Sequence, residues 1–267
     1  MARMKLGAML RKNIYAFVYG REGVGKTNLI MSLAHKSDGS DIAIITPESS
    51  GPTSILSRGF SGDIAVELLP PSGHDPFEPC IKAIESFTRD PSISGICVDG
   101  LTVMCGRGID FLSDGQGEKA MGYDGWGQLL NGFRMVEAAA EKASRAGKSV
   151  LFTAWENPPQ YEDTMGGQSV KALGRPLLQG KAQTWMPGNC DVVARMTSKF
   201  TKEVVNGKAM PVFKASLQVN ANAEWFAKTR WLLPDPCPAD LKYILQQVQS
   251  QSGGKVSAPV LKKVVAK

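Results

Sequence analysis

The chain has 267 residues, enough for one large α/β domain, and its hydrophobic share of 43% is ordinary for a soluble globular protein. The formal net charge of +6 permits a polyanionic partner, although a lysine-rich C-terminal segment supplies much of it. No apolar run approaches the ~18 residues of a membrane-spanning helix, and no signal core follows the basic N-terminus, so we expect a cytoplasmic protein without membrane contact. The five cysteines are scattered without a C-x-x-C pair, which excludes a disulfide or zinc framework.

The first motif in chain order is a glycine-rich turn. Residues 20–27 read GREGVGKT, after an apolar, β-prone segment (14–19) and before an apolar segment that can be helical (28–34). This sequence fits G-x-x-x-x-G-K-T, the phosphate-binding P-loop, and it stands at the strand-to-helix turn that the P-loop requires. Glycines let the backbone approach an anion closely, and successive backbone N–H groups then face the phosphates. We therefore predict an ATP site with contacts from Gly20, Glu22, Gly23, Val24, Gly25, Lys26, Thr27 and Asn28.

Acidic residues follow three of the predicted strands. Residues 42–45 lead to Glu48, residues 96–98 lead to Asp99, and residues 150–154 lead to Glu156. Ligands of parallel α/β sheets bind beyond the carboxyl ends of the strands, so we expect these acids to share one rim with the P-loop. Lys26 can reach the β and γ phosphates, whereas the Thr27 hydroxyl and Asp99 are the predicted Mg²⁺ ligands. Sequence spacing leaves several candidates open for the acid that activates water: Glu48, Glu156, Asp110, Asp114 and Glu118.

The remaining segments alternate between strands and helices, which predicts an α/β fold with a mainly parallel central sheet flanked by helices. Asn206-Gly207 between two β-prone runs adds a C-terminal β-hairpin region. We divide the chain into a basic N-terminal arm (1–13), an ATPase core (14–249) and a flexible lysine-rich tail (250–267). The other predicted segments are a strand at 64–69, a helix at 76–89, a glycine-rich loop at 106–127, a helix at 129–146, an irregular region at 159–190 and a last helix at 238–249.

Several motifs together resemble one family, the RecA-like P-loop ATPases, and in particular the phage nucleotide-binding and single-strand-annealing proteins of that group. The resemblance covers about residues 12–245. Its motifs are the P-loop, Thr46-Pro-Glu48, Val98-Asp-Gly-Leu-Thr102, Phe152-Thr-Ala154, the Gly180-Lys181 region and Lys228-Thr-Arg230.

The resemblance implies roles for particular residues. Glu48 matches the acid that activates the attacking water, and Lys228 and Arg230 match cations that reach a neighbouring subunit's γ-phosphate. The segments at about 105–125 and 160–185 take the places of two DNA-binding loops. The second segment contributes the predicted nucleic-acid contacts Lys171, Arg175, Lys181 and Trp185.

The function implied by the resemblance is a Mg²⁺-dependent ATPase that assembles as a ring or filament on single-stranded DNA. It would promote phage recombination or annealing in the host cytoplasm, with a single-stranded-DNA-binding protein as a further partner. The chain departs from RecA in having Trp155-Glu-Asn157 where RecA has a strand-ending glutamine, and its 267 residues are too few to be expected to include RecA's large C-terminal domain. A hexameric helicase or packaging motor, a small-molecule P-loop kinase and a nucleotide-dependent protein-binding module remain open as alternatives.

Overall fold

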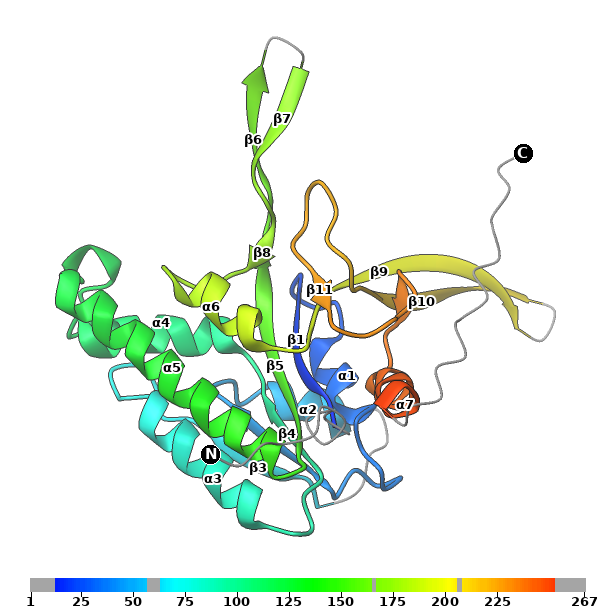
Figure 1. Cartoon of the computed structure of the whole chain (residues 1–267), viewed down its shortest axis with the longest axis horizontal. Helices are drawn as coiled ribbons and strands as arrows, with labels where there is room; N and C mark the ends of the chain where they lie inside the picture. Colours follow the sequence, from blue (N-terminus) through cyan, green and yellow to red (C-terminus); the bar gives the residue numbers. More distant parts are fainter. Residues whose placement is uncertain (1–12, 57–62, 165–166, 206–207, 253–267) are drawn as a thin grey trace, which may run out of the picture.

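The computed structural model describes residues 13–56, 63–164, 167–205 and 208–252 (Figure 1). The strands are β1 (Tyr15–Gly20), β2 (Ile42–Thr46), β3 (Ala65–Leu68), β4 (Gly95–Val98), β5 (Ser149–Asn157), β6 (Gln160–Thr164), β7 (Gly167–Ala172), β8 (Arg175–Pro176), β9 (Val192–Val205), β10 (Lys208–Gln218), β11 (Lys228–Thr229) and β12 (Cys237–Pro238). The helices are α1 (Lys26–Met31), α2 (Gly51–Leu56), α3 (Phe77–Arg89), α4 (Leu101–Leu112), α5 (Tyr123–Arg145), α6 (Ala182–Asn189) and α7 (Leu241–Ser252), with a 3₁₀ turn at Glu118–Ala120.

The central sheet has the strand order β12-β10-β9-β1-β5-β4-β2-β3, with β11 beside β9 and β8 beside β5. The neighbours from β9 to β3 run parallel, whereas β10 is antiparallel to β9. The structure therefore confirms the predicted mainly parallel sheet and its C-terminal hairpin. β1 lies in the middle, so the P-loop that follows it is held at the centre of one rim.

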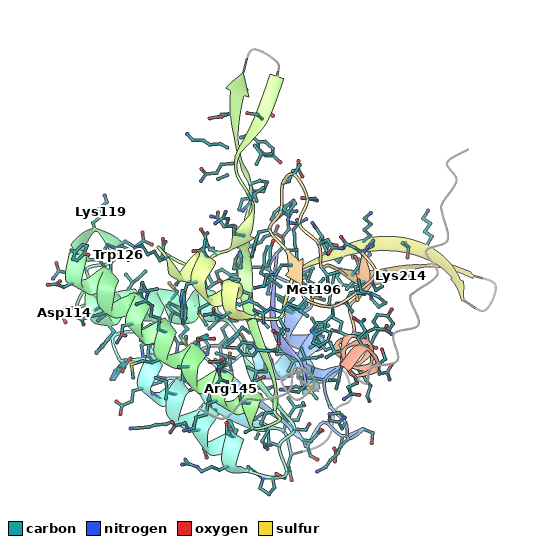
Figure 2. The ribbon with its side chains drawn as sticks, viewed as in Figure 1. Asp114, Lys119, Trp126, Arg145, Met196 and Lys214 are labelled. Carbon is teal, nitrogen blue, oxygen red and sulfur yellow. The ribbon has the colours of Figure 1, made fainter. Side chains whose placement is uncertain are left out.

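Helices cover both faces of the sheet. Successive side chains of a strand point to opposite faces, and β1 is apolar on both. Its residues Tyr15, Phe17 and Tyr19 join a core with α3, α4, α5 and α6, and Ala16 and Val18 join a second core with α1, α2 and α7. Figure 2 shows the side chains that fill these layers. No helix among the described residues is long and apolar enough to cross a membrane.

Two predicted irregular regions are in fact ordered elements. The predicted glycine-rich loop at 106–127 is wrong over much of its length, because α4 continues to Leu112 and α5 begins at Tyr123. Gly108 belongs to α4, and a Cβ there would lie 2.8 Å from the Phe77 ring. A Cβ at Gly132 of α5 would lie 2.6 Å from the same ring. Glycine therefore serves close helix packing in this layer.

The predicted irregular region at 159–190 is also wrong. It contains the antiparallel β6–β7 hairpin, called here the β6–β7 arm, and helix α6. The arm rises from the end of β5 away from the sheet (Figure 1). Its described residues are mostly polar on both faces, so the alternation that marks a half-buried strand is missing from the sequence.

The two ends of the chain extend beyond the described residues. Of the predicted N-terminal arm, 1–12 lie outside them, whereas the buried Asn13 amide donates to the Ser144 carbonyl and hydroxyl oxygens, each at 3.0 Å. Helix α7 continues to Ser252, so the predicted tail at 250–267 starts too early, and 253–267 lie outside the described residues.

Candidate nucleotide-binding and active site

The P-loop connects β1 to α1 through three glycines that the backbone requires. Gly23 and Gly25 have φ values of 68° and 99°, in the left-handed region that side chains disfavour. Gly20 has no room for a side chain, because a Cβ would lie 2.5 Å from the Met196 carbonyl oxygen of β9. The loop conformation is therefore fixed by local backbone geometry and by β9.

Lys26 is held inside the loop that it follows. Its side chain is buried (8% exposed), and Nζ donates to the carbonyl oxygens of Gly20 and Arg21, both at 2.8 Å. An ammonium group has three donors, so one N–H remains for a phosphate oxygen. Burial lowers the pKa of Lys26, and the nearby Asp99 carboxylate opposes that shift.

Asp99 lies at the end of β4 and is held by two threonine hydroxyls. Thr27 Oγ1 donates to Asp99 Oδ2 at 3.0 Å, and the fully buried Thr153 hydroxyl donates to Oδ1. Thr153 in turn accepts the Gly100 N–H at 3.0 Å. Hydroxyl and carboxylate oxygens are ligands that Mg²⁺ prefers, and few protein ligands suffice when phosphates supply others. Thr27 and Asp99 therefore fit a Mg²⁺ ion, which when bound neutralises charge on the transferring phosphates.

Glu48 lies two residues after β2 and lines the same cavity as Lys26, Thr27 and Asp99, a space of about 440 Å³. Its backbone N–H donates to Thr46 Oγ1 at 3.0 Å, which fixes the turn. Burial, and then the charge of Asp99, raise the pKa of the Glu48 carboxyl. A carboxylate with a raised pKa beside a phosphate site suits a general base.

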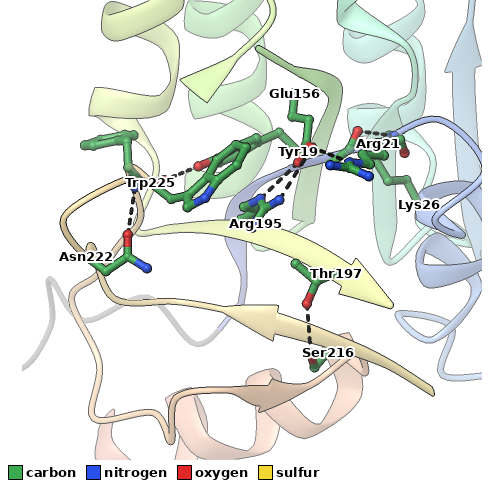
Figure 3. A network of polar contacts seen from close by, with 11 residues as sticks. Tyr19, Arg21, Lys26, Glu156, Arg195, Thr197, Ser216, Asn222 and Trp225 are labelled. Atoms are coloured by element: carbon green, nitrogen blue, oxygen red, sulfur yellow. Dashed lines mark hydrogen bonds and ion pairs between the residues drawn. The ribbon is translucent and has the colours of Figure 1, made fainter. Parts of the chain in front are cut away.

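Glu156, the competing acid on this rim, is occupied by two arginines. Its carboxylate pairs with Arg21 of the P-loop at 3.1 Å and with Arg195 of β9 at 2.9 Å, and its side chain is 7% exposed (Figure 3). Arg195 also stacks over the Trp225 ring at 3.3 Å from the centroid. Both carboxylate oxygens of Glu156 are engaged by guanidinium groups, whereas Glu48 lines the cavity, so the geometry favours Glu48 for water activation.

The predicted loop acids are engaged elsewhere. Asp110 lies nine residues into α4, about 14 Å along the helix from the rim, and accepts from Ser72. Glu118 accepts from the Gln179 amide at 2.7 Å. Asp114 has a positive φ of 49° in the turn after α4. These positions belong to the opposite end of α4 from the cavity.

Arg107 is a positioning residue that the sequence did not reveal. From α4, its guanidinium donates to the Leu69 carbonyl oxygen at 3.1 Å and to the carbonyl oxygens of Pro47 and Pro70. Pro47 immediately precedes Glu48, so Arg107 fixes the segment that carries the candidate base. The sequence placed this arginine in a loop, which hid its contact with the end of β2.

Lys228 and Arg230 do not line the cavity of their own chain. β11 pairs with β9 at Val192 and Val193, and Val192 also pairs with Ala16 near the start of β1. The P-loop follows the other end of β1, so β11 lies at the end of β9 that is far from the P-loop. Lys228 Nζ donates to the Gly188 carbonyl oxygen, and Arg230 pairs with Asp191 at 3.0 Å. Their contact with a neighbouring subunit stays a prediction.

The four predicted nucleic-acid residues lie on different elements. Lys171 is exposed on the β6–β7 arm at the bulge opposite Gln160 and Tyr161, and the paired strand β6 also carries the acids Glu162 and Asp163. The other three are separate: Arg175 of β8 lies over the Phe226 ring at 6.0 Å, Lys181 is exposed at the start of α6, and Trp185 is half-buried against the core with Arg134 over its ring at 5.6 Å.

Comparison with known protein families assigns most of the chain, including this rim, to one family. Residues 12–231 match the AAA domain family, and this range includes the P-loop, Glu48 and Asp99. A search of curated proteins gives no match. The family match spans most of the chain, and membership of this family implies nucleotide binding, typically with Mg²⁺. The chain therefore belongs to the AAA domain family and is a nucleotide-dependent P-loop ATPase.

Proposed function

We propose that this site hydrolyses ATP with Glu48 as the general base. The observation that carries the proposal is the convergence of Glu48, Lys26, Thr27 and Asp99 on one cavity, with Asp99 fixed by two hydroxyls. Glu48 accepts a proton from water as the water oxygen bonds to the γ-phosphorus. The bond from that phosphorus to the β–γ bridging oxygen breaks, and ADP leaves with the electron pair. The free N–H of Lys26 stabilises the negative charge on the γ-phosphoryl oxygens.

We further propose that the ATPase is RecA-like and assembles as a homo-oligomer on single-stranded DNA. Support comes from the RecA-like motif set of the sequence and from the net charge of +6. In the assembly, Lys228 and Arg230 of one subunit approach the γ-phosphate of the next, so that turnover depends on DNA. Recombination or annealing of phage DNA in the host cytoplasm, with a single-stranded-DNA-binding protein as partner, is the corresponding biological role.

The test measures ATP turnover with and without single-stranded DNA at several salt concentrations. We expect DNA to stimulate turnover and higher salt to abolish the stimulation, because phosphate contacts release counterions. The Lys26→Ala variant should lose turnover in both conditions. Electron microscopy with a non-hydrolysable ATP analogue should show rings or filaments on the DNA. Equal turnover with and without DNA would refute the DNA-dependent part and leave the ATPase assignment intact.

A further inference from the structure

The β9–β10 hairpin continues well past the rim of the sheet as a two-stranded ribbon (Figure 1). β1 pairs with β9 only as far as Arg195, and β12 pairs with β10 only at Ser216 and Leu217. We call residues 198–205 and 208–215 the outer ribbon. Neighbouring strands lie about 5 Å apart, so a ribbon of two strands is narrow. A ligand that lies along one edge of the outer ribbon can therefore contact side chains from both of its faces.

One face of the outer ribbon carries an exposed aromatic pair. Phe200 and Phe213 are directly opposite each other, 78% and 40% exposed, with ring centroids 5.3 Å apart and an interplanar angle of 68°. Lys202 lies two residues beyond Phe200 on the same face and is exposed. Apolar rings of this size are usually buried, so their exposure side by side points to a ligand that packs on them.

The opposite face carries a like-charged pair. Lys199 and Lys214 are directly opposite each other, and both are exposed. Two exposed cations at opposed positions of a β-ladder suit contact with the phosphates of a polyanion. By sequence, the outer ribbon has four lysines and one acid, Glu203. The described part of the β6–β7 arm has two acids and one lysine.

We propose that the outer ribbon is the single-stranded DNA-binding surface, in place of the predicted segments at about 105–125 and 160–185. Bases stack on Phe200 and Phe213, and phosphates contact Lys199, Lys202 and Lys214. Stacking rings combined with cations along a strand are the features that bind single strands irrespective of sequence. This inference rests on the proposed DNA-dependent function and identifies where the DNA lies.

β9 also connects the outer ribbon to the ATP site. The Met196 carbonyl oxygen packs against Gly20 of the P-loop, and Arg195 shares the Glu156 carboxylate with Arg21 (Figure 3). DNA bound on the outer ribbon therefore lies on the same strand that supports the P-loop. This continuity gives a physical route by which DNA raises ATP turnover.

The test measures binding of a fluorescein-labelled oligothymidylate of about 30 nucleotides by anisotropy, using the full chain. Phe200→Ala/Phe213→Ala should weaken binding about 10-fold or more. Lys199→Gln/Lys214→Gln should make the slope of log affinity against log salt shallower by about 1.4, which is two phosphate contacts on a single strand. The control Lys82→Gln/Lys142→Gln removes the same charge from exposed positions of α3 and α5 and should change neither quantity.

The outcomes separate the inference from the proposed function. If the wild-type protein binds the oligonucleotide and both ribbon variants bind it with the same affinity, the inference is wrong. The proposed DNA-dependent ATPase activity would still stand. Absence of wild-type binding would overturn both. Sedimentation with a non-hydrolysable ATP analogue supplies a third readout: if the ribbon variants lose assembly without DNA, the outer ribbon is a subunit interface and the inference is wrong.

Discussion

Thr153→Val tests whether the hydroxyl of Thr153 organises the metal-binding acid. Valine keeps the shape of threonine but removes a fully buried hydroxyl that donates to Asp99 Oδ1 and accepts the Gly100 N–H at 3.0 Å. The substitution leaves a buried N–H without this partner, which costs about 1–3 kcal/mol of unfolding free energy. For a chain of this size we therefore expect Tm to fall by about 2–12 °C.

The same substitution should weaken Mg²⁺ dependence more than ATP affinity. Partners that orient a metal ligand typically contribute about 10–100-fold to metal affinity, so the Mg²⁺ concentration for half-maximal turnover should rise by about that factor. Mg²⁺ titration of ATP turnover measures this, and thermal unfolding measures the stability loss. Thr184→Val, at an exposed position of α6, is the matched control. A wild-type Mg²⁺ titration for Thr153→Val would refute the positioning role of the hydroxyl.

Three further substitutions test other parts of the site. Glu48→Gln should retain fluorescent-nucleotide binding and lose about 10²–10⁴-fold in kcat. Because the pKa of Glu48 is raised above its usual 4.5, wild-type turnover should fall as pH drops through that raised value. The residual activity of the variant should lack this fall at acid pH. If the fall is unchanged in the variant, it belongs to another group. Gly20→Ala should lower the unfolding free energy by about 1–3 kcal/mol in urea titration, because its Cβ would lie 2.5 Å from the Met196 carbonyl oxygen. The control Gly127→Ala on α5 should not destabilise the protein, because nothing lies within 4 Å of its Cβ. Arg107→Met should lower kcat about 10–100-fold with little change in KM, because it frees the segment that carries Glu48; an equal rise in KM would instead indicate a loss of ATP binding.

The sequence predicts the rim of the sheet well because the relevant signals are local. An apolar run followed by a glycine-rich turn or an acid marks the carboxyl end of a strand, and parallel topology alone brings such ends together. For this reason Lys26, Thr27, Glu48 and Asp99 could be grouped before any coordinates, and the structure brings them to one cavity. No long-range register has to be known for this step.

The choice between Glu48 and Glu156 needs tertiary contacts. Both acids follow apolar strands, so spacing alone does not separate them, and only the family resemblance assigned water activation to Glu48. The two arginines that occupy Glu156 come from the P-loop and from β9, and the second is 39 residues further along the chain. Lys228 and Arg230 show the same dependence, because the antiparallel pairing of β11 with β9 decides which end of the sheet they occupy.

The β6–β7 arm and the outer ribbon show why surface function is harder to predict than the ATP site. The family resemblance assigned DNA contact to about residues 160–185, where basic and aromatic residues lie close together along the chain. In the structure these residues lie on β7, β8 and α6, and Trp185 packs on the core. Lys199 and Lys214 are instead 15 residues apart in sequence and become a pair only through the register of β9 with β10, as do Phe200 and Phe213. A binding surface built from cross-strand pairs has no linear motif, whereas the P-loop is a single continuous segment, so only the P-loop can be read from the chain in order.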